Sequence, residues 1–194
     1  MTLATAAFLG LLLVVPASAQ LVLPPGFTAE VYVTGEGFDP ASERGVRGIP
    51  STATLGFDAS GVLYLARTGA RFRSGEAEDL NPIYRIPAGG ARVTPEAERR
   101  VTWGPPLRNP QVAAVGSAGE VFVTTYDRDR RLGAVYRLRD GRASLFAGGT
   151  PPAGSPPLFR RAEGIAVDGA GNVFVADREE GVVVRLDPSG QVSS

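Results

Sequence analysis

The feature that most constrains the fold is a pattern that occurs three times along the chain. The copies cover residues 53–69, 111–127 and 163–179 and align without a gap. Each copy holds two short apolar runs joined by a turn, and a third run follows. A turn glycine recurs at Gly61, Gly119 and Gly171. The number of residues between successive turn glycines exceeds the repeat of about 40–50 residues that is usual for propeller blades. The extra residues lie in loops.

Each copy has the chemistry of a tight hairpin followed by a third strand. The turn reads Asp-x-x-Gly at Asp58 and Asp168, where the carboxylate accepts hydrogen bonds from the turn backbone and the glycine supplies a positive φ. Gly116 replaces the aspartate in the second copy. The third run carries an arginine in register, at Arg85, Arg137 and Arg185. A more polar fourth strand is expected at 91–97 or 99–103 in the first copy and at 142–149 in the second.

These units predict an all-β fold, a β-propeller with about three blades of four-stranded antiparallel sheet. The expected blades span 50–105, 108–150 and 160–194, the last one truncated, and 26–37 holds a lone N-terminal strand of the kind that closes a ring. Because propellers typically have four to eight blades, we expect an incomplete arc of a larger ring, a fragment of a longer protein. Its open edges favour self-association, and closure by oligomerisation is the alternative.

The first nineteen residues are interpreted as a signal peptide. The apolar run 6–15 is too short to cross a bilayer of about 30 Å, and Ala17-x-Ala19 is a signal-peptidase site, so cleavage is expected after Ala19. An uncleaved N-terminal anchor is the alternative, because the segment before the run has no Arg or Lys. We expect a periplasmic or secreted protein with no stable membrane insertion after cleavage.

Composition excludes several kinds of chemistry. The chain has no Cys and no His, and all twenty basic residues are Arg. Catalytic triads, lysine Schiff bases and zinc sites with Cys or His ligands are therefore excluded. A formal net charge of zero gives no electrostatic reason to bind nucleic acid.

The stretch EGIAVDGAGNVFVADREEGVVVRLDPSG resembles an NHL repeat, and the lead-in LPPGFTAEVYVTG resembles the start of exported propellers of the soluble sugar-dehydrogenase type. The resemblance implies a six-bladed propeller related to NHL, gluconolactonase/regucalcin, strictosidine-synthase-like and quinoprotein sugar-dehydrogenase proteins. These relatives have different activities, so the resemblance implies a fold and leaves the function open. The quinoprotein enzymes use a catalytic His, which this chain lacks.

Three positions are candidates for a cation site. Ala53, Gln111 and Glu163 each lie five residues before the turn, where first strands begin at the mouth of a central channel. In the gluconolactonase/regucalcin family the equivalent positions carry Glu, Asn and Asp that bind a divalent metal. The resemblance therefore implies Gln111 and Glu163 as ligands of Ca²⁺ or another divalent cation; the alternative is that Glu163 is an ordinary residue of the repeat.

Two functions follow as hypotheses. The first is a non-catalytic scaffold of the cell envelope that binds a protein, peptide, glycan or small molecule through its loops. The second is a metal-dependent lactonase or hydrolase of the gluconolactonase/regucalcin type. The segment 126–132, YDRDRRL, is interpreted as a solvated loop, with an arginine-based anion site as the alternative.

Overall fold

The computed structural model describes residues 23–35, 52–67, 80–94 and 96–193. The predicted signal peptide, 1–19, lies outside these residues. The chain divides into two units, Met1–Glu30 and Val31–Ser194. In the described part of the first, the Phe27 N–H donates to the Pro24 carbonyl at 3.1 Å in a single turn. No described helix is long and apolar enough to span a membrane.

The second sheet is the complete four-stranded meander that the repeat predicts. Its strands are β8 (Pro110–Val115), β9 (Val121–Asp127), β10 (Leu132–Arg139) and β11 (Arg142–Gly148). Neighbours in the chain are neighbours in the sheet, and all pairs are antiparallel. The outer strand β11 covers most of the predicted 142–149.

The first and third sheets have three strands each, with only a bridge in the fourth position. The first consists of β2 (Thr52–Phe57), β3 (Leu63–Arg67) and β5 (Ile83–Ile86), and the third of β12 (Ala162–Val167), β13 (Val173–Asp177) and β14 (Val182–Leu186). Antiparallel bridges join Tyr84 to Thr102 and Leu186 to Val192. Of the two segments expected to flank the first sheet, 99–103 therefore contacts β5. Among the residues that the structure describes, four full strands, as predicted, occur in the second sheet alone.

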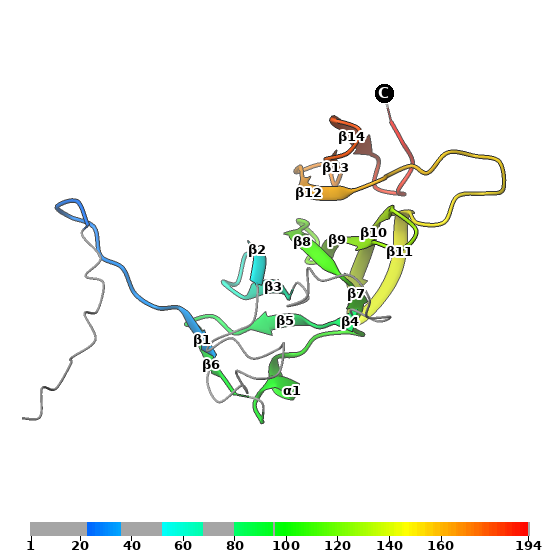
Figure 1. Ribbon diagram of the computed structural model, residues 1–194. Coiled ribbons are helices and arrows are strands. Elements are labelled where there is room, and N and C mark those ends of the chain that lie inside the picture. The colour runs from blue at the N-terminus through cyan, green and yellow to red at the C-terminus, as the bar shows by residue number, and fades with distance from the viewer. Residues whose placement is uncertain (1–22, 36–51, 68–79, 95, 194) are drawn as a thin grey trace, which may run out of the picture. The chain divides into compact units, whose positions relative to one another are not determined.

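The three sheets lie in chain order and contact each other through their first strands: β2 contacts β8, and β8 contacts β12 (Figure 1). Buried side chains of the first and second sheets form one core cluster, including Tyr64, Ile83 and Val121. A second cluster joins the second sheet to the third, including Phe122 and Val173. Successive antiparallel meanders that pack face to face in this way are the blades of a β-propeller, so the predicted fold class is confirmed.

The N-terminal strand differs from the prediction. β1 (Val33–Gly35) begins later than expected, and it pairs in parallel with β6 (Ala91–Val93) rather than closing a last blade. Gly90 permits this contact: it has φ 88°, and a Cβ there would lie 2.0 Å from the carbonyl oxygen of Tyr32. Tyr32 and Val33 pack against the cluster of Leu63, Leu65 and Val93, so this segment covers the outward face of the first sheet.

Three short elements lie between the first and second sheets. They are α1 (Glu98–Val101), β4 (Leu80–Asn81) and β7 (Leu107–Arg108), and β4 pairs with β7. None was predicted, because two-residue strands and a single helical turn leave no periodic signal in a sequence.

The predicted turn chemistry is confirmed in the first and third copies. Asp58 Oδ1 accepts the N–H groups of Ser60 and Val62 at 2.9 and 3.0 Å. Asp168 Oδ1 accepts those of Ala170 and Asn172 at 2.9 and 2.8 Å. The turn glycines have φ values between 80° and 84°. A fourth turn of this kind, 187–190, follows β14, with Asp187 as the acceptor.

Candidate functional site

The predicted metal positions lie at one end of the sheets, where β8 and β12 begin. We call this the loop end, because the β9–β10 loop and the β13–β14 loop lie there as well. The Asp-x-x-Gly hairpins lie at the opposite end, the turn end. Gln111 and Glu163 occupy β8 and β12 at the loop end, and Ala53 has the equivalent backbone position in β2.

Each of these three strands is interrupted by a β-bulge at this position or at the residue that follows it. In β12, Ala162 and Gly164 face consecutive residues of β13, so Glu163 is the extra residue. The same one-residue skip occurs between Pro110 and Ala113 in β8 and between Ala53 and Leu55 in β2. Bulges re-aim side chains and are common beside functional sites. The sequence predicts the positions but not the bulges.

The Glu163 carboxylate is held by two arginines. Its Oε1 lies 2.7 Å from Arg161 Nε and 3.2 Å from Arg178 Nη1. The Arg161 guanidinium also lies 5.2 Å from the centre of the Tyr126 ring, within the range of a cation–π interaction. Glu163 therefore joins the segment before β12 to the loop after β13.

Gln111 is directed toward its own strand. Its Nε2 donates to the backbone oxygen of Asn109 at 3.1 Å and to Asn109 Oδ1 at 3.0 Å. The buried Thr124 hydroxyl lies between the two strands: it accepts the N–H of Val112, the residue after Gln111, at 3.1 Å and donates to the Glu163 carbonyl at 3.4 Å. The structure thus places Gln111 and Glu163 on adjacent strands, with their side chains bound to different partners.

Asp177 is the residue that organises the loop end, and the sequence analysis missed it. It is 2% exposed, and its carboxylate accepts four backbone N–H groups. These belong to Arg160 at 2.7 Å, Arg161 at 3.2 Å, Glu179 at 2.9 Å and Glu180 at 3.1 Å. An aspartate that ends a strand before a polar loop is an Asx-turn signal, so the sequence did contain the information.

Ion pairs add to these backbone contacts. Arg160 Nε lies 2.5 Å from Glu180 Oε1. Arg131, in the β9–β10 loop, pairs with Glu179 in the β13–β14 loop, and this hydrogen bond raises the pKa of the Arg131 guanidinium. Both pairs are partly exposed to solvent, so each contributes little free energy. The Arg131–Glu179 pair joins the loops of two neighbouring sheets, and the Arg160–Glu180 pair joins the β11–β12 connection to the β13–β14 loop.

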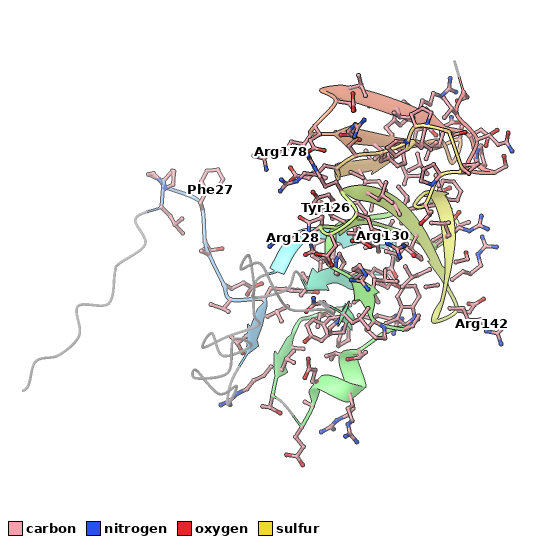
Figure 2. All side chains as sticks on the ribbon, turned by 45° about the vertical axis from the view of Figure 1, so that its right-hand side comes forward. Phe27, Tyr126, Arg128, Arg130, Arg142 and Arg178 are labelled. Atoms are coloured by element: carbon pink, nitrogen blue, oxygen red, sulfur yellow. The ribbon has the colours of Figure 1, made fainter. Side chains whose placement is uncertain are left out.

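A hollow of about 530 Å³ lies beside the β9–β10 loop. Its lining includes Arg108, Thr125, Asp127, Arg130, Tyr136 and Leu145. Asp127 Oδ1 accepts the N–H groups of Asp129 and Arg130, both at 3.1 Å, and Oδ2 lies 3.9 Å from Arg108 Nε. Figure 2 shows the labelled Tyr126, Arg128 and Arg178 side chains near this loop, and Arg142 away from it, at the turn end.

A second hollow, of about 520 Å³, lies at the turn end between the three hairpins. Its acidic side chains are Asp58 and Asp168, which are engaged by their own turns. Side-chain hydrogen bonds from Ser60 and Asn172, respectively, are the main reason that the pKa values of these carboxyls are lowered. Because these carboxylates stabilise the turns, the loop end is the better candidate for a ligand site.

The loop end as described does not fit a metal ion. Two guanidinium groups share the Glu163 oxygen that a cation would need, and the Gln111 amide is bound to Asn109. Within the residues that the structure describes, no three Asp, Glu, His or Cys side chains gather closely enough to hold a metal. Metal binding by Glu163 and Gln111 stays a prediction.

No family model matches the chain. A search of curated proteins also finds no match. Among solved structures, the chain is similar to a gluconolactonase from Xanthomonas campestris, with a TM-score of 0.48, 18% identity, and coverage of 73% of this chain and 45% of that one. It is also similar to the β-propeller domain of the Trilobed protease from Pyrococcus furiosus, with a TM-score of 0.47, 6% identity, and coverage of 74% and 41%.

A third similar structure is a protein from Lactobacillus plantarum, with a TM-score of 0.37, 16% identity, and coverage of 75% of this chain and 42% of that one. The chain thus spans less than half the length of each of these three structures.

Proposed function

We propose that the protein is an exported, six-bladed propeller of the NHL-repeat type that acts as a binding scaffold and holds its ligand at the loop end. The observation that carries this proposal is the fixed loop end itself. Asp177 holds four backbone N–H groups there, and a hollow of about 530 Å³ lies beside the adjoining loop. Loops that are ordered before binding lose less conformational entropy when a ligand arrives, which favours affinity.

The chemistry of the hollow favours a carboxylate-bearing ligand. Arg108 and Arg130 line the hollow together with Asp127 and Asp129. Because Asp127 accepts two backbone N–H groups and pairs with Arg108, the Arg130 guanidinium is the group that we expect to meet a ligand carboxylate in a two-point geometry. Tyr136 and Leu145 add an aromatic and an apolar surface. Ligand pockets commonly combine apolar walls with a few polar groups, and about 530 Å³ lies within their usual size range of roughly 300–1,000 Å³. An acidic glycan, an acidic peptide or a small carboxylate meets these requirements.

Calorimetric titration tests this proposal with polygalacturonate, polyglutamate and galacturonate as probes and neutral dextran as the comparison. We expect at least one acidic probe to bind, with an affinity that falls as salt rises, and dextran not to bind. Arg130→Glu should weaken binding at least tenfold. Arg142→Glu is the matched control, since Arg142 is also exposed but lies at the turn end. Equal affinities of the two variants, or no binding of any acidic probe, would contradict the proposal.

The metal-dependent lactonase is the second candidate. The observation that favours it is that Gln111 and Glu163 lie on β8 and β12, the contacting first strands of neighbouring sheets, and that Thr124 bonds both Val112, next to Gln111, and the Glu163 carbonyl. A cation at Glu163 would have to displace Arg161 and Arg178, which is why the scaffold is the first choice. Thermal melting with Ca²⁺, with Mn²⁺ and with EDTA is the test. A lactonase site predicts a rise in the melting temperature that Glu163→Gln abolishes; unchanged melting counts against it.

Export is tested separately from binding. We expect the mature protein to begin at Gln20, after cleavage behind Ala19. Mass spectrometry of the N-terminal peptide, from the soluble fraction outside the inner membrane, measures this. A mature chain that keeps residues 1–19 would instead support the membrane anchor.

A further inference from the structure

The hairpin of β10 and β11 brings three arginines to one face of the second sheet. Its two-residue loop, Asp140 and Gly141, has positive φ values of 51° and 70°, as a type I′ turn requires. This turn fixes the register, so that Arg139 lies directly opposite Arg142. Arg137 lies two residues before Arg139, and side chains two apart in a strand point to the same face. We call these three residues, at the turn end of the sheet, the arginine hairpin.

Two of these arginines face each other with like charge. Directly opposite side chains on antiparallel strands have Cβ atoms about 4.5–5.5 Å apart, and like charges at that distance destabilise a sheet. Arg139 has one distant partner, since its Nη2 lies 3.8 Å from Glu120 Oε2. Arg142 has no ion-pair partner among the residues that the structure describes. An anion between the two guanidinium groups would remove this repulsion.

Arg137 lacks the acidic neighbour that its equivalent has in the third copy of the repeat. There, Arg185 lies near enough to Asp168 for their charges to interact. In the second copy, Gly116 stands at the position of that aspartate. The Arg137 guanidinium lies instead over the ring of Phe146, 5.6 Å from its centre. A cation–π contact of this kind leaves the N–H groups available as hydrogen-bond donors.

A hollow of about 520 Å³ lies over the hairpin, and its lining consists of Arg137, Arg139, Asp140, Arg142, Ala143 and Ser144. Three positive charges and one negative charge surround it, so it attracts anions. The Ser144 hydroxyl donates to the Arg137 carbonyl at 3.4 Å, which leaves the guanidinium groups as the donors. The Arg139 side chain is 59% exposed, and Arg142 is exposed at the end of the sheet, so a ligand can reach both from solvent (Figure 2).

The hollow lies outside the contacts between sheets. Leu138 points to the opposite face of β10 and is buried in the cluster between the first and second sheets. The third sheet meets β11 at Phe146: a Cβ at Gly190 would lie 2.4 Å from the Phe146 carbonyl oxygen. After this turn, residues 191–193 continue antiparallel to β14, which directs them toward the loop end. A further sheet would pack on the third sheet, so the accessibility of the hairpin does not depend on one.

We propose that the arginine hairpin binds a tetrahedral oxyanion, a phosphate or sulfate group. Guanidinium groups donate charge-assisted hydrogen bonds to the oxygens of such groups. A tetrahedral group presents its oxygens in several directions, so it can accept from three guanidinium groups at once. A carboxylate presents two oxygens in one plane and serves fewer of them. The bound anion would also neutralise the repulsion between Arg139 and Arg142.

Calorimetric titration with inorganic phosphate and with inorganic sulfate, at constant ionic strength, tests this proposal. We expect at least one of them to bind, and acetate not to bind. Arg139→Gln and Arg142→Gln should each weaken binding at least about fivefold. Asp140→Asn should strengthen it, because a negative charge leaves the hollow while asparagine still tolerates the positive φ. Arg130→Gln is the matched control, since Arg130 is also exposed but lies at the loop end, and its affinity should equal that of the parent.

Thermal melting gives a second measurement. The bound anion should raise the melting temperature of the parent, and this rise should be smaller in Arg139→Gln and in Arg142→Gln. Glucose 6-phosphate and vesicles that contain phosphatidic acid identify the source of the group: tighter binding of one indicates a soluble ester or a lipid headgroup, and binding of neither indicates the free ion.

Three results would overturn the proposal. They are failure of both inorganic anions to bind, unchanged affinity in Arg139→Gln and Arg142→Gln, and equal binding of acetate and phosphate. Binding of galacturonate at the loop end should be unchanged in Arg139→Gln, and binding of phosphate should be unchanged in Arg130→Gln. The two proposals therefore fail or succeed separately.

Discussion

Phe159 is the side chain whose removal should affect this protein most. It lies in the connection between β11 and β12, is 0% exposed, and packs in the cluster between the second and third sheets. Its backbone oxygen accepts the Gly133 N–H at 3.0 Å. The next two residues are Arg160 and Arg161, which contribute to the loop end. We therefore expect Phe159→Ala to loosen both the sheet interface and the loop end.

The size of this loss of stability follows from the contacts of the Phe159 ring. A buried aromatic side chain removes roughly 150–250 Å² from water, and at about 25 cal/mol per Å² this contributes about 4–6 kcal/mol. Alanine keeps only a small share of that burial. The neighbours cannot fill the cavity, because the ring rests on Gly133 and Gly148; a Cβ at Gly148 would lie 2.7 Å from Phe159 Cδ2. We expect a loss of about 4 kcal/mol, within the range of about 3–5 kcal/mol for Phe→Ala in cores.

Urea unfolding, followed by circular dichroism and by the fluorescence of the single tryptophan, Trp103, measures this loss. In a thermal scan it corresponds to a fall of about 8–16 °C for a chain of this size. Phe27→Ala is the control, because Phe27 is 69% exposed, and its free energy of unfolding should change by less than about 0.5 kcal/mol. If Phe159→Ala were no more destabilising than Phe27→Ala, the described packing of the second and third sheets would be wrong.

Three further predictions concern backbone contacts and carboxylates. Gly133→Ala should lower the free energy of unfolding by about 1–3 kcal/mol in chemical denaturation, because its Cβ would lie 2.7 Å from the Ala162 nitrogen. Gly169→Ala is the control: a Cβ there meets nothing within 4 Å, so the free energy of unfolding should not change. Asp177→Ala should cost about 2–3 kcal/mol, since it leaves backbone N–H groups without their charged acceptor, while Asp177→Asn, which keeps an acceptor, should cost less. Hydrogen bonds lower the pKa values of Asp58, Asp168 and Asp187 below 3.8, and the largest contributions come from the side chains of Ser60, Asn172 and Ser189. The ionised carboxylates therefore stabilise the fold at pH values above 3.8. This stabilisation is lost as the pH falls through the lower pKa values that these groups have in the folded state. Melting temperatures measured from pH 6 down to pH 2 should therefore fall less steeply for a triple Asp→Asn variant than for the parent, and parallel curves would contradict the assignment.

The hairpins are features that could be predicted from the sequence alone. The Asp-x-x-Gly turns were predicted because all their determinants lie within four residues: an acceptor, two spacers and a glycine with positive φ. The short apolar runs between the turns likewise predicted the strands and their order, since each strand pairs with the next along the chain. The same local signal was present at Asp177, where an acceptor ends β13 before a polar loop.

Other features depended on partners that are distant in the chain. The sequence placed the predicted N-terminal strand at the closure of a ring, but β1 pairs with β6, whose residues follow about sixty positions later. Glu163 and Gln111 were predicted as metal ligands from their shared position. The structure engages Glu163 with Arg161 and Arg178 and Gln111 with Asn109, in strands interrupted by bulges. Ion pairs of this kind depend on how the loops lie, which no local pattern specifies.

The sequence by itself determined that this protein is a series of antiparallel meanders, because turn chemistry and short apolar runs are defined by a few neighbouring residues. Tertiary structure decided which surfaces those meanders leave accessible. Only the packing of whole sheets shows that Tyr64 and Phe122 are covered while Phe174 is not, although all three occupy the same place in the repeat. The burial of a side chain depends on which residues lie across the interface from it, and those residues can be more than fifty positions away in the chain.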